Sequence, residues 1–418
     1  MKIIHFCNSD LIGGAARAAY SLNKALNNAN LTSSMLVQKK SSNEKTVYPF
    51  VNTALEKLGY ARRIALDYLF IKYLSLKKKG RFSFPFWGVN LSRNTLIKQA
   101  DIIHLHWINQ GYFSIKTFKS LAGLNKPIVW TLHDMWAFTG GCHYSGGCEK
   151  FISECKNCPS LKFSSENDFS NKIFTNKILT YKNLNIDIVT CSKWLADEAK
   201  RSYLFQNKKI TPIPNPIEID IYKPMDQKTA RAKLNLPQDK KLILFGTMTL
   251  KEKRKGFSYL KSALDFLDKE HPELKDEIEV LVFGSSKNST IDRIPFNTNF
   301  VGRIADVNKL VQCYNSADLF AAPSLEDNLP NTVMESLSCG VPVVAFNIGG
   351  MPDMIGHKSN GYLAKPYSHQ DFAEGLYWIL TGTDKQKLQT NAREKVINNF
   401  TPDIIGKRYL DLYKSILN

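Results

Sequence analysis

Apolar and polar positions along this chain fall into two recurring patterns. Short continuous apolar runs predict buried strands, and they cover residues 2–7, 34–38, 101–106, 127–132, 186–191, 241–246, 278–283, 318–322 and 341–346. Elsewhere apolar residues recur every three or four positions, which predicts helices at about 15–28, 256–268, 306–315, 331–338, 368–381, 386–399 and 402–417. Because strands that alternate with helices pair in parallel, the chain is predicted to be an α/β protein with doubly wound parallel sheets.

The alternation is interrupted between residues 206 and 235. Pro212, Pro214 and Pro216 lie within five residues, and proline fits neither a helix interior nor a central strand. We therefore expect a Rossmann-like domain at 1–205, a linker at 206–235 and a second Rossmann-like domain at 236–400. Two such domains imply a central cleft, with ligands at the carboxyl ends of the strands.

The composition is that of a folded protein without a membrane span. Of the 418 residues, 43% are hydrophobic and 11% aromatic, which suffices for two cores and excludes a disordered chain. No apolar run reaches the roughly 18 residues of a transmembrane helix. The apolar start of the chain stops at Asn8, too early for a signal peptide, so we expect a cytoplasmic protein.

The net charge of +18 is concentrated in the first half of the chain. Residues 1–205 contain 28 Lys and Arg against 13 Asp and Glu, whereas residues 206–418 contain 28 against 25. A basic half of this kind attracts nucleic acid, anionic lipid headgroups or phosphorylated acceptors. The charge alone does not choose among them.

Residues 60–87 combine basic and aromatic side chains. A helical segment at 60–74 is followed by a lysine run at 77–79 and by aromatic residues at 82–87. This composition is typical of a membrane-surface contact, which would place the protein on the inner face of the membrane as a peripheral protein. The alternative is an amphipathic helix packed on the sheet beside a solvated lysine run.

The stretch Pro323–Val344 carries the strongest chemical signal. It is predicted to form strand, loop, short helix and strand, so the N-terminus of the helix follows the carboxyl end of a strand. Backbone N–H groups at such a helix start form an anion site suited to a diphosphate. Asp327 in the loop and Glu335 on the helix can accept hydrogen bonds from sugar hydroxyls. Taken alone, the two acids are better explained structurally, Asp327 as a helix cap and Glu335 as a solvated helix residue.

This stretch resembles the signature of the retaining family 4 glycosyltransferases, which have the GT-B fold of two Rossmann-like domains facing a central cleft. In that signature a Glu, seven residues and a second Glu precede small residues, Gly, Pro and an apolar strand. Asp327 takes the first acidic position and Glu335 the second, and Pro330 interrupts the usual Gly-Phe-Gly. The resemblance implies that Asp327 binds the hydroxyls of the donor sugar and Glu335 the nucleotide ribose. It leaves Asn328, Leu329, Asn331 and Thr332 as donors to the phosphate and sugar.

Two further segments extend the resemblance. Gly13 and Gly14 follow the first strand, as the family's glycine loop does, and glycine lets a backbone approach a phosphate or sugar closely. The alternative there is a plain strand-to-helix turn. Arg254 and Lys255 match the cations that the family places on the donor diphosphate, although Thr247 replaces the usual early Arg. The resemblance implies that they stabilise charge on the leaving group without a catalytic metal, whereas the alternative is a solvated lysine loop.

Histidines end two of the predicted strands. His104 and His106 close one strand, and His133 and Asp134 follow the next. Carboxyl ends of strands face the expected cleft, and the resemblance places His106 near the sugar and the acceptor. Gly13, His133 and Asp134 would then lie on the acceptor side. By alternation His104 shares a side of its strand with His106, so one of the two can be a core residue.

Four of the eight cysteines lie within 17 residues, at Cys142, Cys148, Cys155 and Cys158. In a cytoplasmic chain such a cluster favours a structural Zn²⁺, although only the last pair has zinc-knuckle spacing. Packed free thiols or a redox pair are the alternatives. In each case we expect the segment to hold a loop beside the acceptor site.

We therefore predict a retaining glycosyltransferase that moves a hexose or N-acetylhexosamine from a nucleotide-diphosphate sugar, UDP- rather than GDP-linked, to a lipid-linked saccharide in surface-polysaccharide assembly. The residues predicted to act in catalysis are His106, Arg254, Lys255 and Asp327. By resemblance, the helix at about 402–418 crosses back to the first domain. One alternative is a non-catalytic partner subunit with this fold, favoured by the departures at Asp327 and Pro330. The other is a nucleic-acid-binding protein, favoured by the charge but lacking any known nucleic-acid-binding signature.

Overall fold

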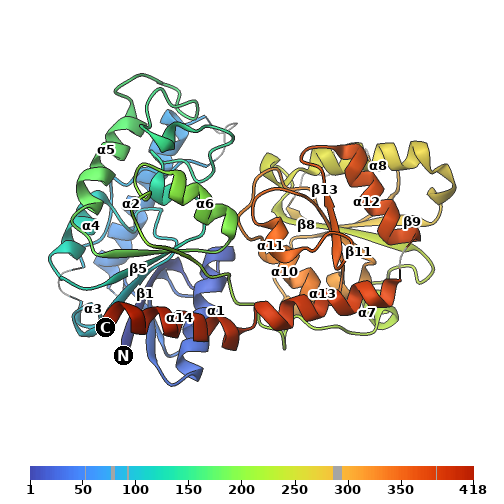
Figure 1. Ribbon diagram of the computed structural model, residues 1–418, viewed down its shortest axis with the longest axis horizontal. Helices are drawn as coiled ribbons and strands as arrows, with labels where there is room; N and C mark the ends of the chain where they lie inside the picture. The colour runs from blue at the N-terminus through green and yellow to red at the C-terminus, as the bar shows by residue number, and fades with distance from the viewer. Residues whose placement is uncertain (52, 77–80, 92–93, 286–293, 383) are drawn as a thin grey trace. The chain divides into compact units, whose positions relative to one another are not determined.

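The computed structural model describes residues 1–51, 53–76, 81–91, 94–285, 294–382 and 384–418, so the lysine run at 77–79 lies outside the described residues. The chain forms two compact units. Unit 1 consists of Met1–Pro216 and Ile405–Asn418, and unit 2 consists of Ile217–Ile404. Each unit is built around one parallel sheet with helices packed on it (Figure 1). The predicted α/β class with doubly wound parallel sheets is therefore confirmed.

Unit 1 contains a seven-stranded sheet in the order β3-β2-β1-β4-β5-β6-β7. Its strands, all paired in parallel, are Lys2–Ser9 (β1), Thr32–Lys39 (β2), Val47–Pro49 (β3), Ile102–Leu105 (β4), Ile128–Leu132 (β5), Ile186–Thr190 (β6) and Ile210–Pro212 (β7). The chain winds outward from β1 to β3 and then returns to β4 on the other side of β1. In such sheets ligands bind at this switch point, beyond the carboxyl ends of the central strands.

Helices cover both faces of this sheet. They are Gly14–Asn28 (α1), Ala54–Leu74 (α2), Thr95–Gln99 (α3), Ile115–Ala122 (α4), Phe169–Tyr181 (α5), Lys193–Arg201 (α6) and Pro402–Leu417 (α14). One buried cluster joins Ile3 of β1 and Ile102 of β4 to α1 and α14. A larger cluster, rich in aromatic residues, includes Phe118, Trp130 and Phe174. Burial on both faces explains why the strands are continuous apolar runs in the sequence.

The last helix, α14, is docked on unit 1 by apolar packing and by hydrogen bonds. Tyr413 Oη lies 2.6 Å from His104 Nδ1, and Tyr409 Oη lies 2.8 Å from Thr131 Oγ1. Thr131 Oγ1 is also 2.7 Å from His104 Nε2. Both ring nitrogens of His104 therefore have partners in the core. Of the two histidines, His104 is the core residue, and His106 lies at the end of the strand.

Helix α2 is long and largely exposed. A capping box between Thr53 and Glu56 fixes its start, and Arg63 Nε donates to Gly111 O at 2.9 Å, which ties the helix to unit 1. Only Asp67 is buried among its described residues. Among the residues that the structure describes, no helix has the length and apolar character needed to cross a bilayer.

Unit 2 repeats the strand order of unit 1. Its six strands lie in the order β10-β9-β8-β11-β12-β13 and are Lys241–Thr249 (β8), Ile278–Ser285 (β9), Asn297–Gly302 (β10), Leu319–Ala322 (β11), Val343–Phe346 (β12) and Gly361–Ala364 (β13). Its helices are Gln227–Lys233 (α7), Phe257–Glu270 (α8), Val307–Ser316 (α9), Asn331–Ser338 (α10), Met351–Met354 (α11), His369–Thr381 (α12) and Lys385–Asn399 (α13). The switch point of this sheet lies between β8 and β11.

Two elements occupy the segment expected as a linker. Strand β7 pairs with β6 at the edge of the sheet, and α7 packs on α9 in unit 2. Proline is accommodated in β7 because an edge strand needs hydrogen bonds on one side only. Strands β3, β10 and β13 are absent from the predicted pattern, because β3 has only three residues, β13 begins with glycine and is half-buried in its middle, and β10 contains two asparagines and a threonine.

Candidate active site

A pocket lies at the switch point of unit 2. It is formed at the carboxyl ends of β8 and β11, beside the N-terminus of α10, and its empty volume of about 240 Å³ includes open solvent. It is lined by small and apolar side chains and one cation: Phe245, Gly246, Lys255, Phe320, Ala321, Ala322, Pro323, Ser324, Pro330, Thr332 and Val333. Because a helix N-terminus carries partial positive charge, this pocket favours an anion.

The two predicted cations are held beside the pocket by a tight turn. Lys253–Lys255 form a single 3-10 turn, which ends at Gly256 with φ 71°. A Cβ on Gly256 would lie 1.8 Å from Pro323 O, so only glycine permits this close approach of the turn to the end of β11. Arg254 and Lys255 are therefore fixed in place, which is not the solvated loop that was the alternative.

Asp327 is buried, and its carboxylate is paired with both cations. Lys255 Nζ donates to Oδ2 at 2.6 Å, and Arg254 Nη1 lies 3.0 Å from Oδ1. Ser324 Oγ also donates to Oδ2, at 3.2 Å. Burial raises the pKa of Asp327, but the two cations outweigh it and hold the pKa well below its usual range. Asp327 is thus ionised and orients Arg254 and Lys255. The N-cap position of α10 is occupied by Pro330 and not by Asp327.

Glu335 lies on α10 and is only 4% exposed, so it is not the solvated residue of the alternative interpretation. Its Oε2 accepts a hydrogen bond of 2.7 Å from Tyr314 Oη of α9. Burial, with the nearby charge of Glu335, raises the pKa of Tyr314 well above its ordinary value, so the tyrosine remains a donor. The remaining predicted donor residues lie in the same loop and helix start: Asn328 and Leu329 are buried, and Asn331 and Thr332 are half-buried.

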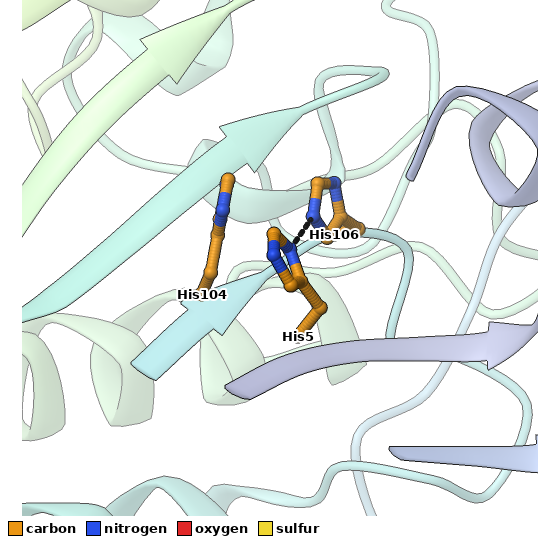
Figure 2. A group of neighbouring side chains, drawn as sticks. All are labelled: His5, His104 and His106. Carbon is orange, nitrogen blue, oxygen red and sulfur yellow. Dashed lines mark hydrogen bonds between the residues drawn. The ribbon is translucent and has the colours of Figure 1, made fainter. Parts of the chain in front are cut away.

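Histidines gather at the switch point of unit 1. His5 of β1 and His104 of β4 are register partners, and His106 follows β4 (Figure 2). His5 Nδ1 lies 3.0 Å from His106 Nε2, and His106 Nδ1 lies 3.3 Å from His133 Nε2. At the other end, His5 Nε2 lies 2.9 Å from Ser33 Oγ. Three imidazoles therefore form a hydrogen-bonded chain from the core to the end of β5.

Burial keeps these imidazoles neutral. It lowers the pKa of His5 to about 3 and that of His133 to about 4, the latter against an opposing effect of Asp134. Burial, together with the neighbouring histidines, also lowers the pKa of His104 and of His106 well below the ordinary value. Near neutral pH each ring therefore offers one N–H donor and one acceptor nitrogen.

The hydrogen bonds of Ser33 set the direction of this chain. Ser33 Oγ donates to Asn23 Oδ1 at 2.8 Å, so its lone pairs face His5 and His5 carries its proton on Nε2. His5 Nδ1 must then accept from His106 Nε2, and His106 Nδ1 must accept from His133 Nε2. Each histidine in the chain is thereby assigned the Nε2–H tautomer, from its partners rather than from observed hydrogens.

One ring nitrogen from each of His5, His104 and His106 lies within 4.8 Å of the other two, a spacing that a metal ion could use. The nitrogens of His104 are hydrogen-bonded to Tyr413 and Thr131, and those of His5 to its neighbours in the chain. The group is therefore explained as a hydrogen-bonded core without a metal.

Asp134 belongs to a second hydrogen-bonded network. Its Oδ2 lies 2.7 Å from His143 Nδ1 and accepts from Trp107 Nε1 at 3.1 Å, and its Oδ1 accepts from Trp136 N at 2.9 Å. His143 Nε2 in turn lies 2.8 Å from Ser83 Oγ. The network fixes the loop after β5. Sequence reasoning missed His143 and Ser83, because a single His and a single Ser far apart in the chain carry no spacing signal.

Gly13 and Gly14 lie at the start of α1. Gly13 is the N-cap residue with φ 94°, a conformation that favours glycine, and a Cβ there would meet no atom within 4 Å. Gly14 is exposed. The start of this 15-residue helix therefore has open space beside it, at the carboxyl end of β1.

Two family models match this chain. Residues 12–221 match the model described as Glycosyltransferase Family 4, and residues 226–397 match the model described as Glycosyl transferases group 1. The putative colanic acid biosynthesis glycosyl transferase WcaC of Escherichia coli (strain K12) is 26% identical over 373 residues, which cover 86% of each chain. The D-inositol 3-phosphate glycosyltransferase of Saccharomonospora viridis is 23% identical over 233 residues, 53% of this chain and 54% of that protein.

Solved structures share the fold over the whole chain. Sucrose-phosphate synthase from Thermosynechococcus elongatus matches with a TM-score of 0.65 at 18% identity, covering 100% of this chain and 99% of that one. HepE from Anabaena, in complex with UDP, matches with a TM-score of 0.65 at 16% identity, covering 99% and 100%. These likenesses and the two parallel sheets show the GT-B fold, as predicted.

Proposed function

Because the chain belongs to glycosyltransferase family 4, we propose that this enzyme transfers a hexose or N-acetylhexosamine from a nucleotide-diphosphate sugar to an acceptor hydroxyl, with retention of configuration. The observation that carries the proposal is the pocket of unit 2, where Lys255 meets the N-terminus of α10 at the switch point of the sheet. A diphosphate suits this pocket because a helix N-terminus and a fixed cation both favour phosphate oxygens. UDP is favoured over GDP, since HepE, which shares the fold, is described in complex with UDP.

The cations and their carboxylate have distinct roles in this proposal. Lys255 and Arg254 neutralise charge that develops on the departing diphosphate. Asp327 positions both, because its two oxygens are ion-paired to them at 2.6 and 3.0 Å. Asp327 also contacts the sugar hydroxyls, and Glu335 contacts the ribose. The loop residues complete the contacts to phosphate and sugar: Asn328, Leu329, Asn331 and Thr332.

The transfer step uses the leaving group as the base. The acceptor oxygen bonds to the anomeric carbon on the face from which the diphosphate departs. The bond between the anomeric carbon and the phosphate oxygen breaks, and its electron pair stays with the diphosphate. The acceptor proton passes to a phosphate oxygen, so the products are the glycosylated acceptor and a protonated nucleoside diphosphate. With Lys255, Arg254 and α10 stabilising the charge, the step needs no catalytic metal.

The acceptor is assigned to the switch point of unit 1, where Gly13, His106 and His133 lie. The imidazoles there are held neutral and in fixed orientation by the chain from Ser33. Neutral imidazoles add no charge at this end of the sheet, and the half-buried ring of His133 is the one of the three that an acceptor can contact. A saccharide acceptor in polysaccharide assembly agrees with the name of the WcaC relative.

A thermal-shift panel of UDP-, GDP- and ADP-sugars tests the proposed donor. We expect UDP-sugars to raise the melting temperature most. A ligand at about 100 times its Kd stabilises the folded state by about 2.7 kcal/mol, so binding of the preferred donor should be measurable. If none of the three classes of nucleotide sugar raises the melting temperature, the donor assignment is contradicted. Salt-sensitive binding of DNA in their place would favour a nucleic-acid-binding protein, and donor-independent assembly with another protein would favour a partner subunit.

Glu335→Gln tests the ribose contact within the same assay. Glutamine can still accept from Tyr314 but loses the charge that strengthens a ribose hydrogen bond, so KM for the donor should rise about 10-fold. Glu394→Gln on the exposed face of α13 is the matched control and should leave KM unchanged. Equal KM in both variants would remove Glu335 from the donor site.

We also propose that α2 contacts an anionic membrane surface, where a lipid-linked acceptor resides. Leu55, Leu58 and Leu69 are 82%, 69% and 45% exposed and recur at helical spacing with the exposed cations Arg62 and Lys72. Apolar side chains flanked by cations insert at lipid headgroups.

Vesicles that contain an anionic lipid should therefore co-sediment the protein more strongly than neutral vesicles. The double variant Leu55→Asp/Leu58→Asp should lose this binding, because each aspartate removes an apolar contact and adds a repelled charge. Leu417→Asp, at another exposed leucine of unit 1, is the control. Equal binding by all three proteins would refute the α2 contact.

A further inference from the structure

The four clustered cysteines meet at one pocket of unit 1 although they are spread over the loop after β5. Cys142, Cys148, Cys155 and Cys158 all line it, together with Phe82 and Phe151. Cys155 and Cys158 are buried, Cys142 and Cys148 are half-buried, and all four are free thiols. A pocket with four thiols is unlike the packing of a lone core cysteine, which apolar side chains surround.

Two turns lie in the segments that connect these cysteines. Gly146 and Gly147, with φ 56° and 84°, form a turn that returns Cys148 toward the segment of Cys142. Asn157, with φ 47°, makes the corresponding turn between Cys155 and Cys158. Cys155 and Cys158 have the spacing of a zinc-knuckle pair, whereas Cys142 and Cys148 are further apart in the chain and are connected through the glycine turn.

Two polar groups lie beside the pocket and can stabilise thiolate sulfur once a metal is bound. Gly140 N donates to Cys155 Sγ at 3.2 Å. The amine of Lys177 is fully buried near the cysteines, donates to Trp136 O and to Thr139 O, and lies 3.9 Å from the centre of the Trp136 ring. A buried amine that donates to carbonyl oxygens is stabilised further by negative charge beside it.

We infer that Cys142, Cys148, Cys155 and Cys158 bind one Zn²⁺ as a closed, structural four-sulfur site. On binding, the metal displaces the four thiol protons to solvent, and the resulting site carries a net charge of about −2. That charge lies near the Lys177 amine. With all four positions filled by protein sulfur, the metal has no place for substrate and does no chemistry.

The site would stabilise the loop that carries the Asp134 network. Cys142 pairs through its backbone with Phe82, next to Ser83, and the side chain of Ser83 bonds His143, the partner of Asp134. Cys158 N donates at 2.8 Å to Asp168, the N-cap of α5. Metal binding therefore ties the loop after β5 both to residues 82–83 and to α5. This inference is independent of the donor assignment.

The inferred zinc site is tested by measuring the metal content of the whole chain and the absorption spectrum of its cobalt-substituted form. The protein, purified without a histidine tag, should contain about one zinc per chain. A thiol-specific mercurial should release this zinc, as measured with a zinc-sensitive dye. Reconstitution with Co²⁺ in place of zinc should give the sulfur-to-metal charge-transfer and visible bands of tetrahedral thiolate coordination.

Cys148→Ser provides the variant, since Cys148 is only half-buried and its replacement leaves the core intact. It should lose most of the zinc, change the cobalt spectrum and lower the melting temperature, whereas Cys313→Ala, which removes a buried thiol of unit 2, should keep the zinc. A zinc-free wild-type protein that gives no cobalt–thiolate bands would overturn the inference. So would full zinc retention in Cys148→Ser, or mass-spectrometric detection of disulfides among the four cysteines in freshly purified protein.

Discussion

Replacing Lys255 by alanine should lower the rate of sugar transfer by about 10²- to 10³-fold, the usual effect of removing one fixed group that stabilises a developing anion. Lys255 lines the pocket of unit 2, and its Nζ is held at 2.6 Å from Asp327. The loss should fall mainly on kcat, because the charge on the diphosphate increases as its bond to the sugar breaks. Steady-state kinetics with the best donor of the thermal-shift panel measure both constants.

The fold should survive this substitution. Asp327 keeps Arg254 at 3.0 Å as a partner, so its buried charge is not left alone. Lys253→Ala is the matched control, since Lys253 belongs to the same turn but is exposed. If both variants lose activity equally, or neither does, the role assigned to Lys255 fails.

Lowering the pH from 7 to 5 should destabilise unit 1 by about 2 kcal/mol for each core histidine that stays neutral when folded. Burial lowers the pKa of His5 to about 3 and of His133 to about 4, and burial lowers the pKa of His104 and His106 well below the ordinary 6.5. In the unfolded chain these groups take up protons at higher pH than in the folded chain. Stability is therefore complete above about pH 6.5 and decreases as the pH falls toward the folded-state pKa values.

Urea denaturation between pH 7.5 and pH 5 measures this dependence. His104→Gln removes one titrating group, so the slope of unfolding free energy against pH should fall by up to about 1.4 kcal/mol per pH unit, whatever the variant's overall stability. His271→Gln, at a partly exposed ring stacked on Tyr377 in unit 2, is the control. A wild-type protein with no slope in this range would show that the buried histidines are not neutral.

Much of the fold could be predicted because strands buried on both faces are continuous apolar runs. The central strands β1, β4, β5, β8, β9, β11 and β12 were all found in this way. The strands that were missed lie at sheet edges, where β3 has only three residues, β13 begins with glycine and is half-buried in its middle, and β10 is polar. Pro212 of β7 and the two prolines after it led to the prediction of a linker, because sequence alone does not distinguish a sheet edge from a connection.

The donor pocket could be predicted in part because its residues are local in sequence. Asp327 and Glu335 lie eight positions apart on one loop and helix, and Lys255 precedes a glycine. Their hydrogen-bond partners are distant in the chain and carry no sequence signal. Tyr314, for example, reaches Glu335 only because α9 packs beside α10. The same holds in unit 1, where Ser33 and Asn23 determine the tautomers of histidines that they do not neighbour in the chain.

The docking of α14 determines the order in which the two units can finish folding. Unit 2 is continuous from Ile217 to Ile404, whereas unit 1 needs residues from both sides of it. During translation His104 and Thr131 are made early, but Tyr409 and Tyr413, which bond them, are made after the whole of unit 2. Domains usually mature in the order of synthesis. Here the unit that begins the chain is the last to complete its core, and until then its sheet carries a partly uncovered apolar face, and His104 lacks its hydrogen bond to Tyr413.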